Sequence, residues 1–167
     1  MEQKRVFSLL VDNTSGVLSR AAGLFSRRGY NIDSLTVGTT YDPRYSRMTV
    51  VVHGDDLILE QIEKQLRKME DVIDVKMLAD GGAVCRELVL IKVRAKEGQR
   101  QDIIAVANVF RANVVDVGSD SMIIELTGNE SKLNAFIELI HNYEILELAR
   151  TGLTGLTRGS EGVLYLD

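Results

Sequence analysis

The sequence contains few cysteine, proline and aromatic residues, and their scarcity excludes several classes of protein. The single cysteine, Cys85, rules out an internal disulfide framework, which predicts a protein of a reducing compartment, the cytoplasm. No stretch of the chain approaches the roughly 20 consecutive apolar residues of a membrane span. Residues 1–5 lead directly into a strand pattern and lack the apolar core of a signal peptide. We therefore expect no membrane association.

The chain also lacks an excess of positive charge. Its net charge is −4, and 5% of its residues are aromatic. Nucleic-acid surfaces, by contrast, cluster Lys and Arg, and single-stranded RNA stacks on aromatic side chains. The composition, 45% hydrophobic and 26% charged, is that of a globular protein. Nucleic acid is therefore not an expected partner.

No constellation of catalytic residues is evident. The two histidines, His53 and His141, have no cysteine or paired carboxylate at metal-ligand spacing. The glycines of residues 152–159 lack the Lys-Ser/Thr that ends a phosphate-binding P-loop, and a lone thiol such as Cys85 is usually inert. We expect neither a catalytic site nor a bound metal or cofactor in this chain.

The chain does contain a regular order of hydrophobic periods. The first part alternates like a strand over residues 4–12, follows helical spacing from Val17 to Gly29, and alternates again over 31–39 and 47–53. The segment 54–56, Gly-Asp-Asp, is typical of a helix start. The apolar stripe of that helix and the final strand follow it: Leu59, Ile62, Leu66, Met69, then residues 72–78.

The same order recurs more faintly after a break at Asp80-Gly81-Gly82. Strands are expected at 87–95, 113–118, 121–127 and 145–150, with one helix at about 101–111. Residues 127–130, Thr-Gly-Asn-Glu, fit a capping box for a second helix. Each half therefore reads as βαββαβ.

A βαββαβ unit usually folds as a four-stranded antiparallel sheet with both helices on one face, the ferredoxin-like arrangement. We predict an α+β protein of two tandem ferredoxin-like units, residues 1–80 and 84–167. Units of this size are marginal for burying a core alone, which favours pairing with another chain. The glycine-rich tail, residues 152–167, is too sparse in apolar residues for an independent element.

The segment that joins the first strand to the first helix is the best candidate for a ligand site. Free backbone N–H groups at a helix N-terminus favour an anion such as an amino-acid carboxylate. Gly16 lets a ligand approach the backbone, and Asn13 can both donate to and accept from a zwitterion. The alternative interpretation is a plain helix cap.

A dimer would complete such a site. In a ferredoxin-like sheet of order 4-1-3-2 the second strand is an edge, which must be covered or paired. If two chains pair through residues 31–39, Asn31 and Ile32 of one chain face Asn13 and Gly16 of the other. The apolar residues expected on the open face of the sheet, a candidate partner surface, are Val6, Leu10, Met48 and Val50.

These residues also carry a family likeness. Residues 12–20 (DNTSGVLSR), 23–35 (GLFSRRGYNIDSL) and 46–49 (SRMT) resemble the ACT domain of acetolactate synthase small subunits. Residues 60–66 (EQIEKQL), 86–88 (REL) and the closing 150–159 extend the likeness across nearly the whole chain. Ser15 stands where many members have proline, and Gly155 where alanine is common.

The resemblance implies a non-catalytic regulatory subunit. Such subunits bind and activate a large thiamine-diphosphate enzyme, a transferase of branched-chain amino-acid synthesis, and confer feedback inhibition by valine, sometimes by leucine or isoleucine. It implies that thiamine diphosphate, Mg²⁺ and FAD belong to that partner. It also implies a homodimer through the ACT domain, with valine bound between two such domains. The positions here that match the family's valine site are Asn13, Gly16, Val17, Leu18, Asn31 and Ile32.

Three other functions remain open from the residues alone. A free-standing amino-acid sensor could control another enzyme. An RNA-binding ferredoxin-like module would need basic and aromatic residues on its sheet, and an autonomous enzyme would need a site that the sequence does not display. Purification with or without a large partner separates the first interpretation from these three.

Overall fold

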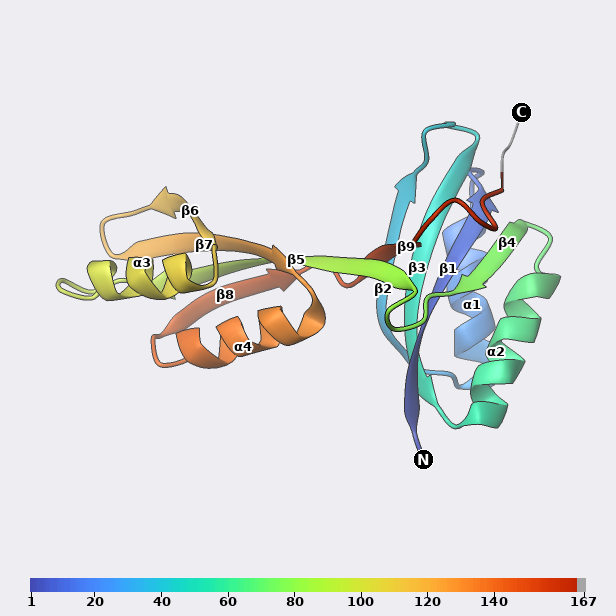
Figure 1. Ribbon diagram of the computed structural model, residues 1–167, viewed down its shortest axis with the longest axis horizontal. Helices are drawn as coiled ribbons and strands as arrows, with labels where there is room; N and C mark the ends of the chain where they lie inside the picture. Colours follow the sequence, from blue (N-terminus) through green and yellow to red (C-terminus); the bar gives the residue numbers. More distant parts are fainter. Residues whose placement is uncertain (165–167) are drawn as a thin grey trace. The chain divides into compact units, whose positions relative to one another are not determined.

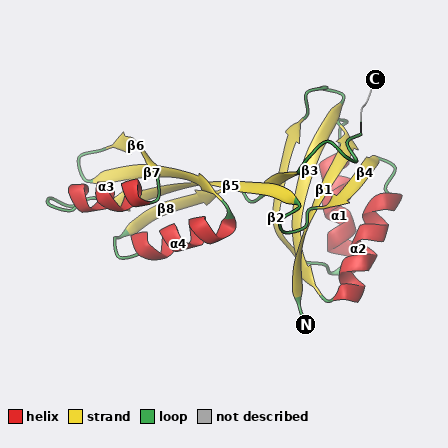
Figure 2. Ribbon diagram, viewed as in Figure 1, coloured by secondary structure: helices red, strands yellow, loops and turns green. Residues whose placement is uncertain are grey.

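The computed structural model describes residues 1–164, which form two compact units. The first unit comprises residues 1–85 together with 153–164, and the second comprises residues 86–152. Each unit is an antiparallel sheet with two helices (Figure 2). The predicted pair of tandem ferredoxin-like units is therefore confirmed.

The first unit has the expected βαββαβ order. Its elements are β1 (Gln3–Asp12), α1 (Val17–Arg28), β2 (Ile32–Thr39), β3 (Tyr45–Gly54), α2 (Asp56–Lys68) and β4 (Val72–Met77). The strand order β2-β3-β1-β4 leaves β2 at an edge, as predicted. Both helices cover one face of the sheet (Figure 1). The core between them is built from alternate strand residues and one stripe of each helix, including Phe7, Leu9, Met48, Phe25 and Ile62.

Local sequence explains where these helices begin and end. Gly29 ends α1 in the left-handed region (φ 67°), and its N–H donates to Ser26 O. Such an end favours glycine because a Cβ is strained at positive φ. Asp55 begins α2 by accepting a hydrogen bond from the Ile58 N–H, the ordinary N-cap of a helix. Of the predicted apolar stripe, Leu59, Ile62 and Leu66 are fully buried, whereas Met69 is half-buried and follows the last residue of α2.

The second unit repeats the order. Its elements are β5 (Ala83–Arg94), α3 (Arg100–Val109), β6 (Asn113–Val117), β7 (Ser121–Gly128), α4 (Glu130–Ile140) and β8 (Ile145–Arg150). The strand order β6-β7-β5-β8 matches that of the first sheet. β5 begins four residues earlier than expected, and its first residues, 83–85, belong to the first unit. A separate core forms around Ile91, Ile103, Ile124 and Phe136.

The predicted capping box at residues 127–130 is wrong. Thr127 lies in β7, and Glu130 is the first residue of α4 rather than its third. The cap is Asn129, whose side chain accepts a hydrogen bond from the Lys132 N–H at 2.9 Å. Because Thr127 pairs with Leu88 in the sheet, its backbone cannot begin the helix.

The C-terminal tail forms part of the first unit, a difference from the expected boundary. It contains a short strand, β9 (Thr154–Thr157), which pairs with β5, whereas the sequence predicted no element there. The Arg158 N–H donates to Gly82 O at 2.9 Å. Gly155 lies so close to β5 that a Cβ on it would be 2.8 Å from Val84 O and 2.6 Å from Cys85 Sγ. Residues 165–167, which the expected tail included, lie outside the described residues.

The tail crosses the open face of the first sheet. A row of paired residues runs across all four strands on that face: Thr36, Thr49, Ser8 and Lys76. The Thr36 hydroxyl donates to Leu153 O at 3.1 Å, and Lys76 Nζ donates to Gly162 O. Figure 1 shows the tail on the side of the sheet away from α1 and α2. It covers the middle of the row, where Ser8 and Thr49 are buried.

The expected open face was therefore partly misassigned. Met48 and Val50 are buried in the core beneath the helices. Their neighbours Arg47, Thr49 and Val51 take the open face, because successive side chains of a strand point to opposite faces. Leu10 does lie on the open face, but it is buried.

Candidate functional site

The loop between β1 and α1 is held at its first residues by backbone hydrogen bonds. The Asp12 N–H donates to Asp71 O at 2.9 Å, and the Asn13 N–H donates to Arg44 O at 2.8 Å. The Asn13 side-chain amide also donates, through Nδ2, to Pro43 O at 2.8 Å. One of the two N–H groups of this amide is therefore engaged within the protein, which leaves its second N–H and its side-chain oxygen for other partners.

Gly16 is the N-cap of α1 and adopts φ 86°, in the left-handed region. No side chain caps this helix. The N–H groups of a first helical turn have no partner within the helix, and here the Val17 N–H donates to Thr14 O at 3.5 Å. The predicted loop therefore ends in a glycine with a left-handed backbone and leads into a helix without a side-chain cap.

An arginine that sequence reasoning missed lies against this loop. Arg20, one turn into α1, binds Asp71 through Nε at 2.6 Å and Nη2 at 2.8 Å. Nη2 also lies 3.5 Å from Ser15 O. A Cβ on Gly16 would be 2.7 Å from Arg20 Nη1. The sequence signal was the position of Arg20, four residues after Gly16, since residues at i and i+4 neighbour each other on a helix.

The ion pair shifts the pKa of both Arg20 and Asp71. Hydrogen bonding from Arg20 is the main cause that holds the pKa of Asp71 below its ordinary value. Hydrogen bonding to Asp71 likewise raises the pKa of Arg20. Both groups therefore keep their charges at neutral pH. They line a hollow on the helical side of the unit, together with Leu24, Arg27, Met69 and Glu70.

One chain does not bring the predicted site residues together. Asn13 follows Asp12, which pairs with Tyr45 at one end of the sheet. Ile32 pairs with Val52, which in turn pairs with Arg5 near the other end. Asn31 and Ile32 therefore lie at the end opposite Asn13 and Gly16. A second chain is needed to join the two groups, as the sequence argument assumed.

The remaining predicted site residues differ in how far their side chains are exposed to a ligand. Val17 is 4% exposed and packs in the core, so only its backbone can reach a ligand. Leu18 is 47% exposed beside it. Asn31 is exposed and Ile32 is half-buried. Near them, His53 Nδ1 contacts the carboxylate of Asp33, so this histidine is paired rather than isolated.

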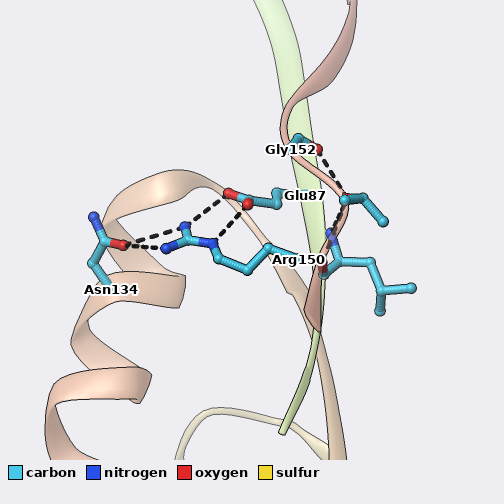
Figure 3. Close-up of polar contacts among 6 residues, drawn as sticks. Glu87, Asn134, Arg150 and Gly152 are labelled. Carbon is cyan, nitrogen blue, oxygen red and sulfur yellow. Dashed lines mark hydrogen bonds and ion pairs between the residues drawn. The ribbon is translucent and has the colours of Figure 1, made fainter. Parts of the chain in front are cut away.

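The second unit contains a buried carboxylate of its own. Glu87 is 6% exposed and binds Arg150 through two hydrogen bonds, of 2.8 and 3.0 Å. Figure 3 shows the Arg150 guanidinium between the Glu87 carboxylate and the Asn134 side chain. Hydrogen bonding to Glu87 raises the pKa of Arg150. With both carboxylate oxygens engaged, Glu87 joins β5 to β8, and we assign it a structural role.

Two further searches cover residues 1–164 of the structure. In that part of the chain, no group of three or more His, Cys, Asp and Glu side chains could hold a metal ion. None of its helices is long and apolar enough to cross a membrane.

Models of known protein families match both units of the chain. The family model described as an AHAS small subunit-like ACT domain matches residues 7–74. The family model described as the small subunit of acetolactate synthase matches residues 86–159. The chain belongs to the acetolactate synthase small subunit family. Its first unit is accordingly an ACT domain.

Individual acetolactate synthase small subunits agree along their whole length. That of Mycobacterium bovis is 48% identical over 156 residues, 93% of this chain and 93% of that protein. The isozyme 3 small subunit of Escherichia coli K12 is 45% identical over 159 residues, 95% of this chain and 98% of that protein. The crystal structure of the acetolactate synthase small subunit from Thermotoga maritima has a TM-score of 0.87 and 41% identity. It covers 95% of this chain and 99% of that chain.

Proposed function

We propose that this chain is the regulatory subunit of acetolactate synthase. It binds the large catalytic subunit, raises its activity and makes the enzyme sensitive to feedback by valine, with leucine or isoleucine as alternative effectors. The observation that carries the proposal is the β1–α1 loop of the ACT domain, with Gly16 at φ 86° and an uncapped helix N-terminus. This loop lies in a chain of the acetolactate synthase small subunit family.

The proposed effector site is shared by two chains. The carboxylate of valine accepts hydrogen bonds from the N–H groups around Gly16, Val17 and Leu18 of one chain, where the helix dipole favours an anion. The side-chain oxygen of Asn13 accepts from the ammonium group, which can only donate, while Nδ2 donates to Pro43 O. Asn31 and Ile32 of a second chain complete the site from the edge strand β2.

Dimerisation through β2 supports this arrangement. β2 is an edge of the first sheet, and an edge strand presents unpaired backbone groups to another chain. Antiparallel pairing of two β2 strands places the start of each beside the far end of the other. The two effector sites of the dimer are then equivalent, as two-fold symmetry requires.

The chemistry of the reaction belongs to the large subunit in this proposal. Thiamine diphosphate, Mg²⁺ and FAD are bound there, and the small subunit contributes a two-state element that the effector biases. Coupling between an effector site and a distant active site typically amounts to about 1–3 kcal/mol, a change of about 5- to 150-fold in affinity. The effector must contact the two states differently, because a ligand that binds both states equally shifts nothing.

The test reconstitutes the chain with its large subunit and measures acetolactate formation against valine concentration. Valine binding to the small subunit alone is measured by calorimetry, with leucine, isoleucine and serine as competitors. Gly16→Asp should abolish the valine response, because it places a side chain at positive φ and a carboxylate where the ligand carboxylate binds. Gly98→Asp is the matched control, since Gly98 also has φ 86° but lies in the second unit. Full valine sensitivity of Gly16→Asp would remove the loop from the mechanism.

The cross-dimer geometry has its own test. Asn31→Ala should weaken valine binding by about 1–3 kcal/mol through loss of a buried hydrogen bond in the complex. It should leave the sheet intact, because Asn31 precedes β2 and is exposed in the single chain. Calorimetry that finds unchanged affinity would contradict the shared site.

The alternative function is a free-standing ACT-type sensor that controls another enzyme. It predicts the same effector binding without association with the large subunit. Sedimentation of the two subunits together separates these functions, since only a regulatory subunit forms the larger complex.

A further inference from the structure

Asp71 joins the effector loop to the rest of the first unit. It lies in the connection between α2 and β4, and its backbone oxygen accepts the hydrogen bond of Asp12 at the start of the loop. Its carboxylate holds Arg20 through two hydrogen bonds. Arg20 in turn approaches Ser15 O and closes the space above Gly16. Both ends of the loop are therefore tied to one aspartate.

The second unit has an equivalent loop between its first strand, β5, and its first helix, α3, but among the described residues no arginine of that helix binds the loop through an acidic partner. The Arg94 N–H donates to Glu144 O at 2.8 Å, as the Asp12 N–H does to Asp71 O. The Glu144 carboxylate, however, binds Arg94 itself, on the strand. Gly98 has the positive φ of Gly16, and the residue four positions after it, as Arg20 is four positions after Gly16, is the exposed Asp102. A Cβ on Gly98, in the equivalent loop, would have no described atom within 4 Å.

This contrast shows that the fold does not require an arginine on the loop. In the second unit the equivalent loop is held by a backbone hydrogen bond, and the equivalent helix position carries the acidic Asp102. In the first unit the same position carries a guanidinium that is 51% exposed at its side chain and directed at the loop by Asp71. An ion pair at the surface of a unit contributes little to stability. Its geometry therefore points to a role in the loop rather than in the core.

We infer that the Arg20–Asp71 ion pair is a positioning pair that presets the effector loop. It keeps residues 13–16 in the binding conformation, so that the effector does not have to order them, and preorganisation of this kind raises affinity. It also connects an occupied loop to the start of β4 through Asp71. The inference rests on the proposed function, because it concerns the regulation of the same site.

The test uses holoenzyme reconstituted with variants of the small subunit. Asp71→Asn removes the charge that directs Arg20, and Arg20→Gln removes the guanidinium. We expect each to raise the valine dissociation constant and the half-inhibitory concentration about tenfold, which corresponds to a binding-competent loop populated about a tenth of the time. Activation without valine and association with the large subunit should stay at wild-type values. Arg20→Lys, which keeps the charge but not the planar fork, should give an intermediate dissociation constant.

Asp120→Asn is the matched control. It removes a carboxylate from Arg94, to which Asp120 is bound at 2.6 Å in the second unit, and it should leave valine affinity unchanged. A loss of valine affinity that followed the loss of thermal stability across all variants would indicate a merely structural role and overturn the inference.

Two outcomes separate this inference from the proposed function. Wild-type valine affinity in both Asp71→Asn and Arg20→Gln would overturn the positioning role and leave the proposed function intact. A wild-type complex that binds no valine, leucine or isoleucine and whose activity none of them changes would overturn the proposed effector function and the inference together.

Discussion

The two units share one topology but complete it with different residues. In both, the second helix begins with a side-chain cap, Asp55 for α2 and Asn129 for α4. The first helices end differently. α1 ends at Gly29 with φ 67°, whereas α3 is followed by Arg111 with φ 56°, in the left-handed region that suits glycine. The comparison teaches that the strand order depends on the hydrophobic pattern, while individual turns tolerate unfavourable residues.

The units also differ in where they bury charge. The buried ion pair of the second unit, Glu87–Arg150, lies between sheet and helix. The ion pair of the first unit that lies beside the candidate site, Arg20–Asp71, is more exposed. The ion pair of the second unit joins two strands of its sheet, whereas that of the first unit lies beside the loop between β1 and α1.

The largest expected effect comes from breaking the buried pair of the second unit. Glu87→Ala leaves Arg150 without its partner, and the loss should fall toward the lower end of about 3–5 kcal/mol because Arg150 is a third exposed. Asp56→Ala, which removes the partner of Arg5 in the first unit, should cost less than about 1 kcal/mol, since Asp56 is 67% exposed. Urea unfolding of both variants measures the difference. Equal losses would contradict the contrast between the units.

The next effect concerns the tail, a feature of the first unit. Gly155→Ala should destabilise the protein by about 1–3 kcal/mol, because the new methyl group meets backbone oxygen and sulfur at under 3 Å. The substitution should also detach residues 153–162 from the sheet, which limited proteolysis detects. Gly82→Ala is the control, since its Cβ would lie 3.7 Å from the nearest atom, an ordinary contact. A Gly155→Ala variant with wild-type stability and protease resistance would show that the tail can shift without cost.

A smaller effect tests the two helix ends. Gly29→Ala should destabilise α1 by about 1 kcal/mol, and Arg111→Gly should stabilise the second unit by a similar or smaller amount, because a Cβ is strained at positive φ. Thermal unfolding measures both. Stabilisation by Gly29→Ala would contradict the strain assigned to that position, and a large loss in Arg111→Gly would mean that Arg111 makes a contact worth more than its strain.

The smallest effect is a dependence on pH. The pKa of Asp71 is lowered in the folded state, mainly by hydrogen bonding from Arg20. The pair therefore contributes stability above the unfolded pKa of aspartate, about 3.9, and loses it as the pH falls through the lower folded pKa. The stability difference between wild type and Asp71→Asn should be constant from neutral pH to about pH 5 and shrink in stronger acid. Unfolding midpoints across this range measure it. A difference that grew on acidification would contradict the assigned shift.

Most of the fold could be predicted because it depends on patterns that are local in sequence. The alternation in β1 and the helical stripe of α2 follow directly from which face is buried. Three errors share one cause. The placement of Met48 and Val50, the cap of α4 and the separate tail each depended on contacts with residues distant in sequence. Thr36 with Leu153 and Val84 with Gly155 are two such contacts.

In the candidate site too, the features that depend on neighbouring residues could be predicted, and those that depend on distant residues could not. Gly16 and the helix N-terminus were recognisable, because a glycine between a strand and a helix predicts a free backbone turn. Arg20 was visible as a residue but not as a part of the loop, since its partner Asp71 is 51 positions away. The engagement of the Asn13 donor by Pro43 O was equally hidden.

The sequence by itself determined the class of fold, the order of its elements and the family likeness, because hydrophobic period and turn residues act over a few positions. Only the tertiary structure decided that the tail belongs to the first unit. It also showed that Arg20 lies against Gly16 and that the two groups of predicted site residues lie at opposite ends of the first sheet. Strand register and long-range ion pairs, which no local pattern encodes, are the physical reason.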